Sequence, residues 1–172
     1  MILTARTGAN AREAANRLPA GSRAVSVALD VTSDGDASAL DAAISEHTDR
    51  VDVLINNAAI RYDSGERAAD PDLRVVREAL ETNVVGAWRT TLSLLPLIGR
   101  SENGRIVNVS SGAGSLSEMA SGTPAYRVSK AALIALTRTL AADLRPHRDP
   151  GHRRLSRLGS HRRGRARGAT GG

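Results

Sequence analysis

The chain has 172 residues and a formal net charge of +6, and it contains no cysteine. That length fits one domain with a real hydrophobic core, and the lack of thiols excludes disulfides and thiolate metal sites. The positive charge belongs to one segment, because residues 1–144 carry 15 Lys+Arg against 17 Asp+Glu, whereas residues 145–172 carry nine Arg and one Asp. We find no run of about 18 apolar residues and no signal-peptide pattern, so we expect a cytoplasmic protein with no membrane partner.

Short apolar runs alternate with stretches of helix length along the chain. In order, the pattern predicts strands at 2–5, 24–29, 51–55 and 105–109 and helices at 10–18, 40–48 from a start near Ser38, and 72–98. The third and fourth strands are rich in β-branched residues and are expected to be buried. Thr123 as N-cap and Pro124 at the first helical position predict a last helix that reaches about Leu144. Strands divided by helices indicate a doubly wound α/β sheet with parallel strands.

Polar residues whose side chains could take part in a reaction follow the predicted strands, at the sheet edge where such folds bind ligands. Tyr126 and Lys130 are four residues apart, hence on one face of the last helix. A neighbouring ammonium favours the phenolate form, which makes Tyr126 a candidate acid or base. Ser110 and Ser111 follow the fourth strand, where either hydroxyl could hydrogen-bond a carbonyl oxygen that gains negative charge.

Four motifs together resemble the short-chain dehydrogenase/reductase family in order and spacing. They are NNAA after the third strand, TNVVG in the long helix, GRIVNVSS at the fourth strand and Y-x-x-x-K in the last helix. The resemblance covers residues 1–147, and the stretch 111–130 looks most like carbonyl reductases. It implies a Rossmann-type fold and hydride transfer between a nicotinamide cofactor and a ketone or aldehyde, with a homo-oligomer in intact relatives.

The resemblance also assigns catalytic roles. Tyr126 would donate a proton to the carbonyl oxygen, and Ser111 would position that carbonyl. Lys130 would favour the phenolate and hold the nicotinamide ribose. Asn83 would hold a water molecule in a proton relay to Lys130. No metal is implied.

Further residues match the positions that hold the adenosine half of the cofactor. Asp30 and Val31 resemble the adenine-contacting pair. Asn56, Ala58 and Ala59 resemble the adenosine-side loop, although Asn56 could equally have a structural role between strands.

Cofactor preference follows from the end of the first strand. Families that bind NAD place an acid there for the ribose 2′-hydroxyl, whereas a 2′-phosphate needs a cation. The sequence offers Arg6 and no acid, which favours NADPH; the alternative is that Arg6 is a solvated strand-end residue.

The expected sheet is incomplete at both ends. No Gly-rich phosphate-binding motif precedes Ile2, and the resemblance places that motif and the first strand upstream of the chain. The C-terminal strands are missing too. We therefore expect an NADPH-dependent reductase core at residues 1–147 with little or no activity of its own. The alternative is a non-catalytic binding protein that uses its basic tail.

Residues 148–172 form an Arg-rich tail that departs from the family pattern and is expected to be disordered. Suitable GC-rich codons for this tail, read one base later, give GIRVTAVCPGW, which resembles the family's next strand and Pro-Gly turn. We therefore hypothesise a one-base frameshift near His147, which DNA lacking that peptide in the shifted frame would contradict. A basic arm for nucleic acid or anionic membrane is the rival, and it lacks interleaved aromatic residues, so nucleic acid is not the favoured partner.

Apolar residues on the two long helices fit either a core face or a subunit interface. We favour the core for most of them. They are Trp88, Leu92 and Leu95 on one helix and Leu133, Leu136 and Leu140 on the other.

Overall fold

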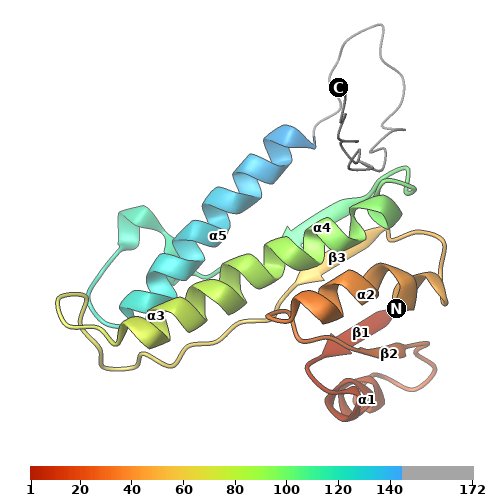
Figure 1. Cartoon of the computed structure of the whole chain (residues 1–172), viewed down its shortest axis with the longest axis horizontal. Helices are drawn as coiled ribbons and strands as arrows, with labels where there is room; N and C mark the ends of the chain where they lie inside the picture. The colour runs from red at the N-terminus through yellow and green to blue at the C-terminus, as the bar shows by residue number, and fades with distance from the viewer. Residues whose placement is uncertain (145–172) are drawn as a thin grey trace, which may run out of the picture.

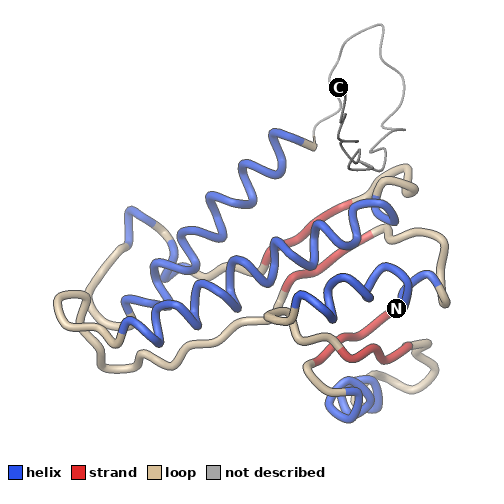
Figure 2. The backbone as a smooth tube through the Cα atoms, in the orientation of Figure 1, coloured by secondary structure: helices blue, strands red, loops and turns tan. Residues whose placement is uncertain are grey.

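The computed structural model describes residues 1–144, in which strands and helices alternate as expected (Figures 1 and 2). The Arg-rich tail and its predicted disorder lie outside these residues. The elements in chain order are β1 (Ile2–Ala5), α1 (Gly8–Asn16), β2 (Val25–Ala28), α2 (Asp34–Ser45), β3 (Val53–Asn56), α3 (Leu73–Leu80), α4 (Ala87–Ile98), β4 (Arg105–Asn108) and α5 (Pro124–Asp143). A π-helical segment (Glu81–Gly86) joins α3 to α4, so the predicted long helix is continuous but locally widened.

The four strands form two parallel pairs. β1 pairs with β2 in a register that sets Ile2 opposite Val25, and β3 pairs with β4 so that Val53 lies opposite Arg105. Within the described chain each pair is a separate two-stranded sheet. The α/β class with parallel strands is confirmed, and the sheet is incomplete in the sense that β1 and β3 share no backbone ladder.

One helical layer holds both pairs. Residues of α2 and α4 make the main core cluster, with Leu40, Leu94 and Leu97 almost fully buried. Ile2 of β1 and Leu54 of β3 both pack on this cluster, so the two pairs lie against the same helices (Figure 1). α1 contacts β1 and β2. Apolar burial, not strand pairing, therefore keeps the two sheets together.

The expectation that the third and fourth strands are buried is wrong for one of their faces. Val53 and Ile55 of β3 are 50% and 60% exposed, and Val107 of β4 is 44% exposed. Leu54 and Ile106 alternate with them and pack on the main core. Successive side chains of a strand point to opposite faces, and the helices cover only one face of this pair.

Capping residues set the helix starts and correct several expected boundaries. α1 begins at Gly8 instead of Asn10, because the Thr7 side chain accepts a hydrogen bond from the Asn10 amide. α2 begins at Asp34, well before Ser38, because the Ser33 hydroxyl accepts from the amide of Asp36. A short polar side chain before the first turn satisfies amides that would otherwise lack a partner.

The start of α5 departs from expectation in another way. Thr123 makes no side-chain cap and adopts a left-handed backbone conformation, with φ of 48°. The acceptor comes instead from Asp63, whose carboxylate lies 3.1 Å from the Tyr126 amide nitrogen. The prediction of Pro124 at the first helical position is confirmed.

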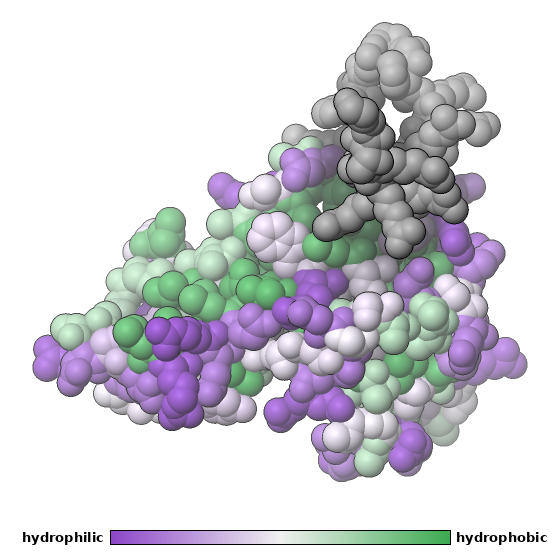
Figure 3. All heavy atoms as spheres, in the orientation of Figure 1, coloured by the Kyte–Doolittle hydropathy of each residue, from purple (hydrophilic) through white to green (hydrophobic). Residues whose placement is uncertain are grey.

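The apolar residues of the long helices divide between core and surface. Leu133 and Leu136 of α5 are buried, as expected. Trp88 and Leu92 of α4 are 44% and 55% exposed, so the core expectation is wrong for these two. Figure 3 shows apolar side chains gathered over α4 and α5 on the face drawn. None of the helices in residues 1–144 is both long and apolar enough to cross a bilayer.

Candidate active site

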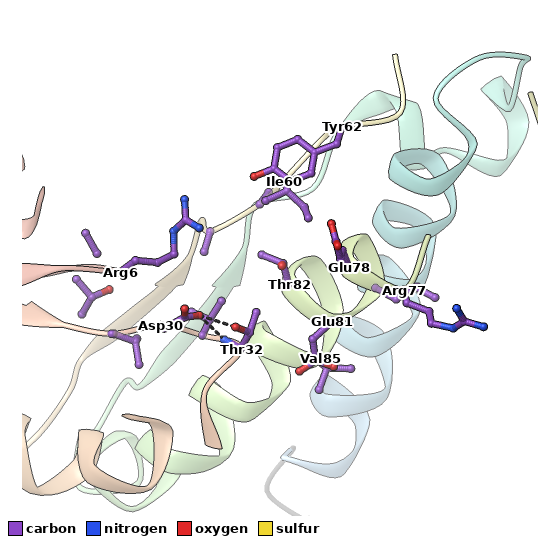
Figure 4. Close-up of a pocket in the computed structure, with 17 residues that line it drawn as sticks. Arg6, Asp30, Thr32, Ile60, Tyr62, Arg77, Glu78, Glu81, Thr82 and Val85 are labelled. Carbon is purple, nitrogen blue, oxygen red and sulfur yellow. Dashed lines mark hydrogen bonds between the residues drawn. The ribbon is translucent and has the colours of Figure 1, made fainter. Parts of the chain in front are cut away.

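A cavity of about 920 Å³ opens at the carboxyl ends of β1 and β2 (Figure 4). Its lining contains most of the residues expected to hold a cofactor. These are Arg6, Asp30, Val31, Ala58 and Ala59. Because the strand ends supply one side and the loop after β3 another, segments distant in the sequence meet there. The volume is within the range of sites that bind small molecules and cofactors.

Asp30 is held in place at the end of β2. Its Oδ1 accepts hydrogen bonds from the hydroxyl of Thr32 at 2.7 Å and from the Thr32 amide at 2.9 Å. These bonds, with a smaller contribution from the charge of Arg6, hold the pKa of Asp30 below its ordinary value. The Asp30 amide donates to Asp36 of α2, so the first turn of that helix anchors the same loop.

Asn56 does not line the cavity and has a structural environment. Its Nδ2 donates to Thr91 of α4 at 3.0 Å and to Asn108 of β4 at 2.8 Å. Asn108 in turn donates to Thr137 of α5. This chain of amides and hydroxyls links β3, β4, α4 and α5, and it favours the structural alternative for Asn56 over the cofactor-binding one.

Most of the far wall of the cavity was not anticipated from the sequence, since Thr82 belongs to the TNVVG motif but the other residues of this wall belong to no motif. Tyr62 comes from the loop after β3, while Glu78, Glu81 and Thr82 come from α3 and the π-helical segment (Figure 4). Arg77 also contributes to the lining. The carboxylates of Glu78 and Glu81 thus lie opposite Arg6 and the Asp30 turn. No motif in the sequence predicts this mixture of charges.

Tyr126 and Lys130 lie together on α5. The Lys130 ammonium is 5.7 Å from the centre of the Tyr126 ring. Lys130 is 3% exposed, and its Nζ donates to the main-chain oxygen of Val109, just after β4, at 2.8 Å. Burial disfavours the charged ammonium and lowers the pKa of Lys130 from its ordinary value. The pair therefore sits at the carboxyl end of a parallel strand, as the sequence predicts.

Two residues of the loop after β3 complete the surroundings of Tyr126. The Arg61 guanidinium lies 5.9 Å from the ring centre, so a second cation lies near the ring. Asp63 is 1% exposed and accepts from the Tyr126 amide, while its second oxygen, Oδ1, is buried without a partner. Neither residue belongs to a recognisable motif.

Asn83 is fully buried in the π-helical segment. Its Oδ1 accepts from the Ile60 amide, and its Nδ2 donates to the Ile60 carbonyl and to the Ser129 hydroxyl. These bonds tie the loop after β3 to α5 and use most of the side-chain hydrogen-bonding capacity. The relay role of Asn83 stays a prediction, and any water would have to be bound mainly through its backbone.

Ser110 and Ser111 differ in what their hydroxyls do. Ser110 donates to the Lys130 carbonyl at 3.3 Å, so it fastens the end of β4 to α5. Ser111 accepts from the amide of Ala113 at 3.2 Å, which leaves its own hydroxyl proton available. A Cβ on Gly114 would lie 2.7 Å from the Lys130 carbonyl carbon, so only glycine lets this loop approach the helix. Ser111 is thus the freer hydroxyl of the pair.

The expected catalytic residues lie outside the cavity lining. The loop after β3 connects the two places, because Ala58 to Ile60 and Tyr62 line the cavity and Asp63 contacts Tyr126. The described residues contain no cluster of three or more groups that could hold a metal ion.

The short chain dehydrogenase family model matches residues 1–148 of the chain. A protein assigned as ketoacyl reductase 2 of the granaticin polyketide synthase in Streptomyces violaceoruber is 39% identical over 150 residues, which are 85% of this chain and 57% of that protein. Several curated relatives are matched over about half of their own length.

Solved structures of related proteins are also similar to most of this chain. The complex of Pseudomonas aeruginosa RhlG with NADP is 33% identical and has a TM-score of 0.72, covering 83% of this chain and 55% of that one. An NADPH-bound carbonyl reductase from chicken fatty liver is 26% identical with a TM-score of 0.71, covering 83% and 62% of the two chains.

Proposed function

Because the chain belongs to the short-chain dehydrogenase family of oxidoreductases, we propose that it is the catalytic core of an NADPH-dependent reductase that acts on a ketone or aldehyde. The observation that carries the proposal is the Tyr126–Lys130 pair at the end of β4, beside a cavity lined by Arg6. The chain spans about half the length of its curated relatives. The proposal therefore concerns the reaction of a protein of the relatives' full length, to which this chain would contribute the catalytic residues.

The cavity fits the adenosine half of a dinucleotide. Asp30 and Val31 on one side and Ala58 and Ala59 on the other would enclose a flat base. Arg6, at the end of β1, supplies the cation that a ribose 2′-phosphate needs, and no carboxylate takes its place there. The related RhlG and carbonyl reductase structures, which hold NADP and NADPH, also support the phosphorylated cofactor.

The cofactor, when bound, would supply the hydride. Tyr126 would give its hydroxyl proton to the carbonyl oxygen, and the nearby Lys130 and Arg61 cations would stabilise the phenolate that results. Ser111, with its hydroxyl proton still available, would hold the carbonyl oxygen in place. Asn83 would fix the loop after β3 against α5 and so keep Tyr126 in position.

The ketoacyl reductase named above supports a ketone as the substrate. We expect slow turnover by the 172-residue chain, because β1 and β3 have no backbone ladder between them to fix the two sides of the cavity. A homo-oligomer that uses the exposed face of α4 is part of the proposal. Cytoplasmic location, inferred from the sequence alone, stays a prediction.

NADPH binding and carbonyl-dependent NADPH oxidation test the proposal. Fluorescence titration of the chain should show NADPH binding tighter than NADH binding, and Arg6→Glu should remove that preference. A 3-oxoacyl thioester and a simple aldehyde would be the two probe substrates. Tyr126→Phe should abolish turnover while NADPH still binds, whereas Ser117→Ala, an exposed serine outside the site, should match the parent. Absence of NADPH binding at millimolar concentration would contradict the proposal.

A further inference from the structure

Arg89 of α4 joins three segments that are far apart along the chain. Its Nε donates to the Asp34 carboxylate at 2.6 Å, and its Nη1 donates to the main-chain oxygen of Val31 at 2.7 Å. Its Nη2 donates to Glu81, in the π-helical segment, at 2.8 Å. The Arg89 side chain is only 18% exposed. A planar guanidinium with fixed donors suits this three-way contact, whereas an ammonium could not reproduce its geometry.

A second, independent contact brings the same two places together. Gly86 lies one helical turn before Arg89. A Cβ at Gly86 would stand 2.8 Å from Cγ2 of Val31 and 3.1 Å from the Val31 oxygen. The turn after β2 is therefore contacted twice, by the backbone at Gly86 and, one helical turn later, by the side chain of Arg89.

The turn held in this way is one wall of the cavity. Asp30, Val31 and Thr32 line it from the β2 side, and Glu81 and Val85 line it from the helical side (Figure 4). The turn after β2 meets the helix at the close approach of Gly86 to Val31 and at the hydrogen bonds of Arg89, so the distance between these walls depends on these two contacts. Arg89 bonds to both walls, through Val31 and through Glu81.

We propose that Arg89 is a positioning residue that fixes the Asp30–Thr32 turn against the helix and so sets the width of the adenosine end of the cavity. This inference rests on the proposed function for its consequence in binding, although the positioning itself does not require a ligand. A turn ordered before binding avoids the entropy cost of ordering it during binding.

Hydrogen exchange of the turn tests the positioning directly. Amides of Asp30, Thr32 and Ser33 are hydrogen-bonded, so their exchange reports opening of the turn. On the whole chain without ligand, Arg89→Gln should speed their exchange by about tenfold, and Arg89→Lys should fall between it and the parent. Arg100→Gln, which removes a surface bond to the Asp49 carbonyl just beyond α4, should leave the turn unchanged. If Arg89→Gln fails to fold, Arg89→Lys carries the test.

NADPH affinity provides the second readout. In Arg89→Gln the turn is ordered for a smaller fraction of the time, so the Kd for NADPH should rise roughly tenfold. Unchanged exchange of the turn in folded variants, or an equal rise in every segment, would overturn the proposal. If the parent chain binds no NADPH, the proposed function fails, and the exchange data still decide whether Arg89 positions the turn.

Discussion

Lys130 is the single lysine of the chain, and it is almost completely buried. Burial lowers the pKa of its ammonium from the ordinary value of 10.5. Between the lowered pKa and that ordinary value the unfolded chain binds more protons than the folded one, so the free energy of unfolding should rise with pH in this window. Each unit of lowering corresponds to about 1.4 kcal/mol.

Lys130→Met should remove that rise. Urea unfolding of the parent and the variant, followed from neutral to alkaline pH, should give a stability difference that changes in the parent's favour as pH increases. Arg138→Met, an exposed change on the same helix, should give a curve parallel to that of the parent. Parallel curves for Lys130→Met as well would show that burial costs the ammonium nothing.

Local spacing made some site residues predictable and others not. Tyr126 and Lys130 follow from a separation of four on a helix, which puts two side chains on one face in any sequence. Arg6 follows from its position at the end of a strand, whereas Asp30 and Ala58 were predicted from the resemblance to the family. Arg89 could not be found this way, because two of its three partners lie 55 and 58 residues away and no motif links them.

Among the elements, α5 depends on a cap that its own sequence does not contain. The buried Asp63 carboxylate accepts from the Tyr126 amide. Asp63→Ala should lower the free energy of unfolding by about 1–2 kcal/mol. It should also speed hydrogen exchange in the first turn of α5, and with it reduce any activity that needs Tyr126.

Asp63→Asn provides the sharper comparison. It keeps an oxygen that can accept from the Tyr126 amide and removes a buried charge whose Oδ1 has no partner. We expect it to be clearly more stable than Asp63→Ala. Asp49→Ala, at an exposed aspartate between α2 and β3, should be close to neutral. Equal losses in the two Asp63 variants would mean that the carboxylate does not act as a cap.

The order and type of the elements were predictable because apolar periodicity records them, while their ends were not. Thr7 and Ser33 shift two helix starts by capping, and a single polar residue carries less signal than a repeated pattern. The burial of β3 was overestimated because Val53 and Ile55 read as core residues, although only the Leu54 side has a covering helix.

For the molecule as a whole, α4 presents exposed apolar side chains. Trp88 and Leu92 are exposed and lie four residues apart on α4, where they form an apolar stripe. We expect self-association through this stripe, which Trp88→Glu should weaken by tenfold or more, roughly the effect of losing an interface anchor. Sedimentation would measure it, and Trp88 is the single tryptophan, so its emission should shift to shorter wavelength as concentration rises.

Leu116→Glu is the matched control, since Leu116 is also exposed but lies on the short turn before α5. It should associate as the parent does. A chain that stays monomeric at all concentrations, or equal weakening by both substitutions, would rule out the α4 stripe as an interface.

Because the main core packs against both strand pairs, the dimensions of the cavity depend on buried apolar contacts as well as on the hydrogen bonds of Arg89 at its walls. Leu40 does not line the cavity, yet Leu40→Ala should shift the two strand pairs relative to each other and so change the affinity for a ligand.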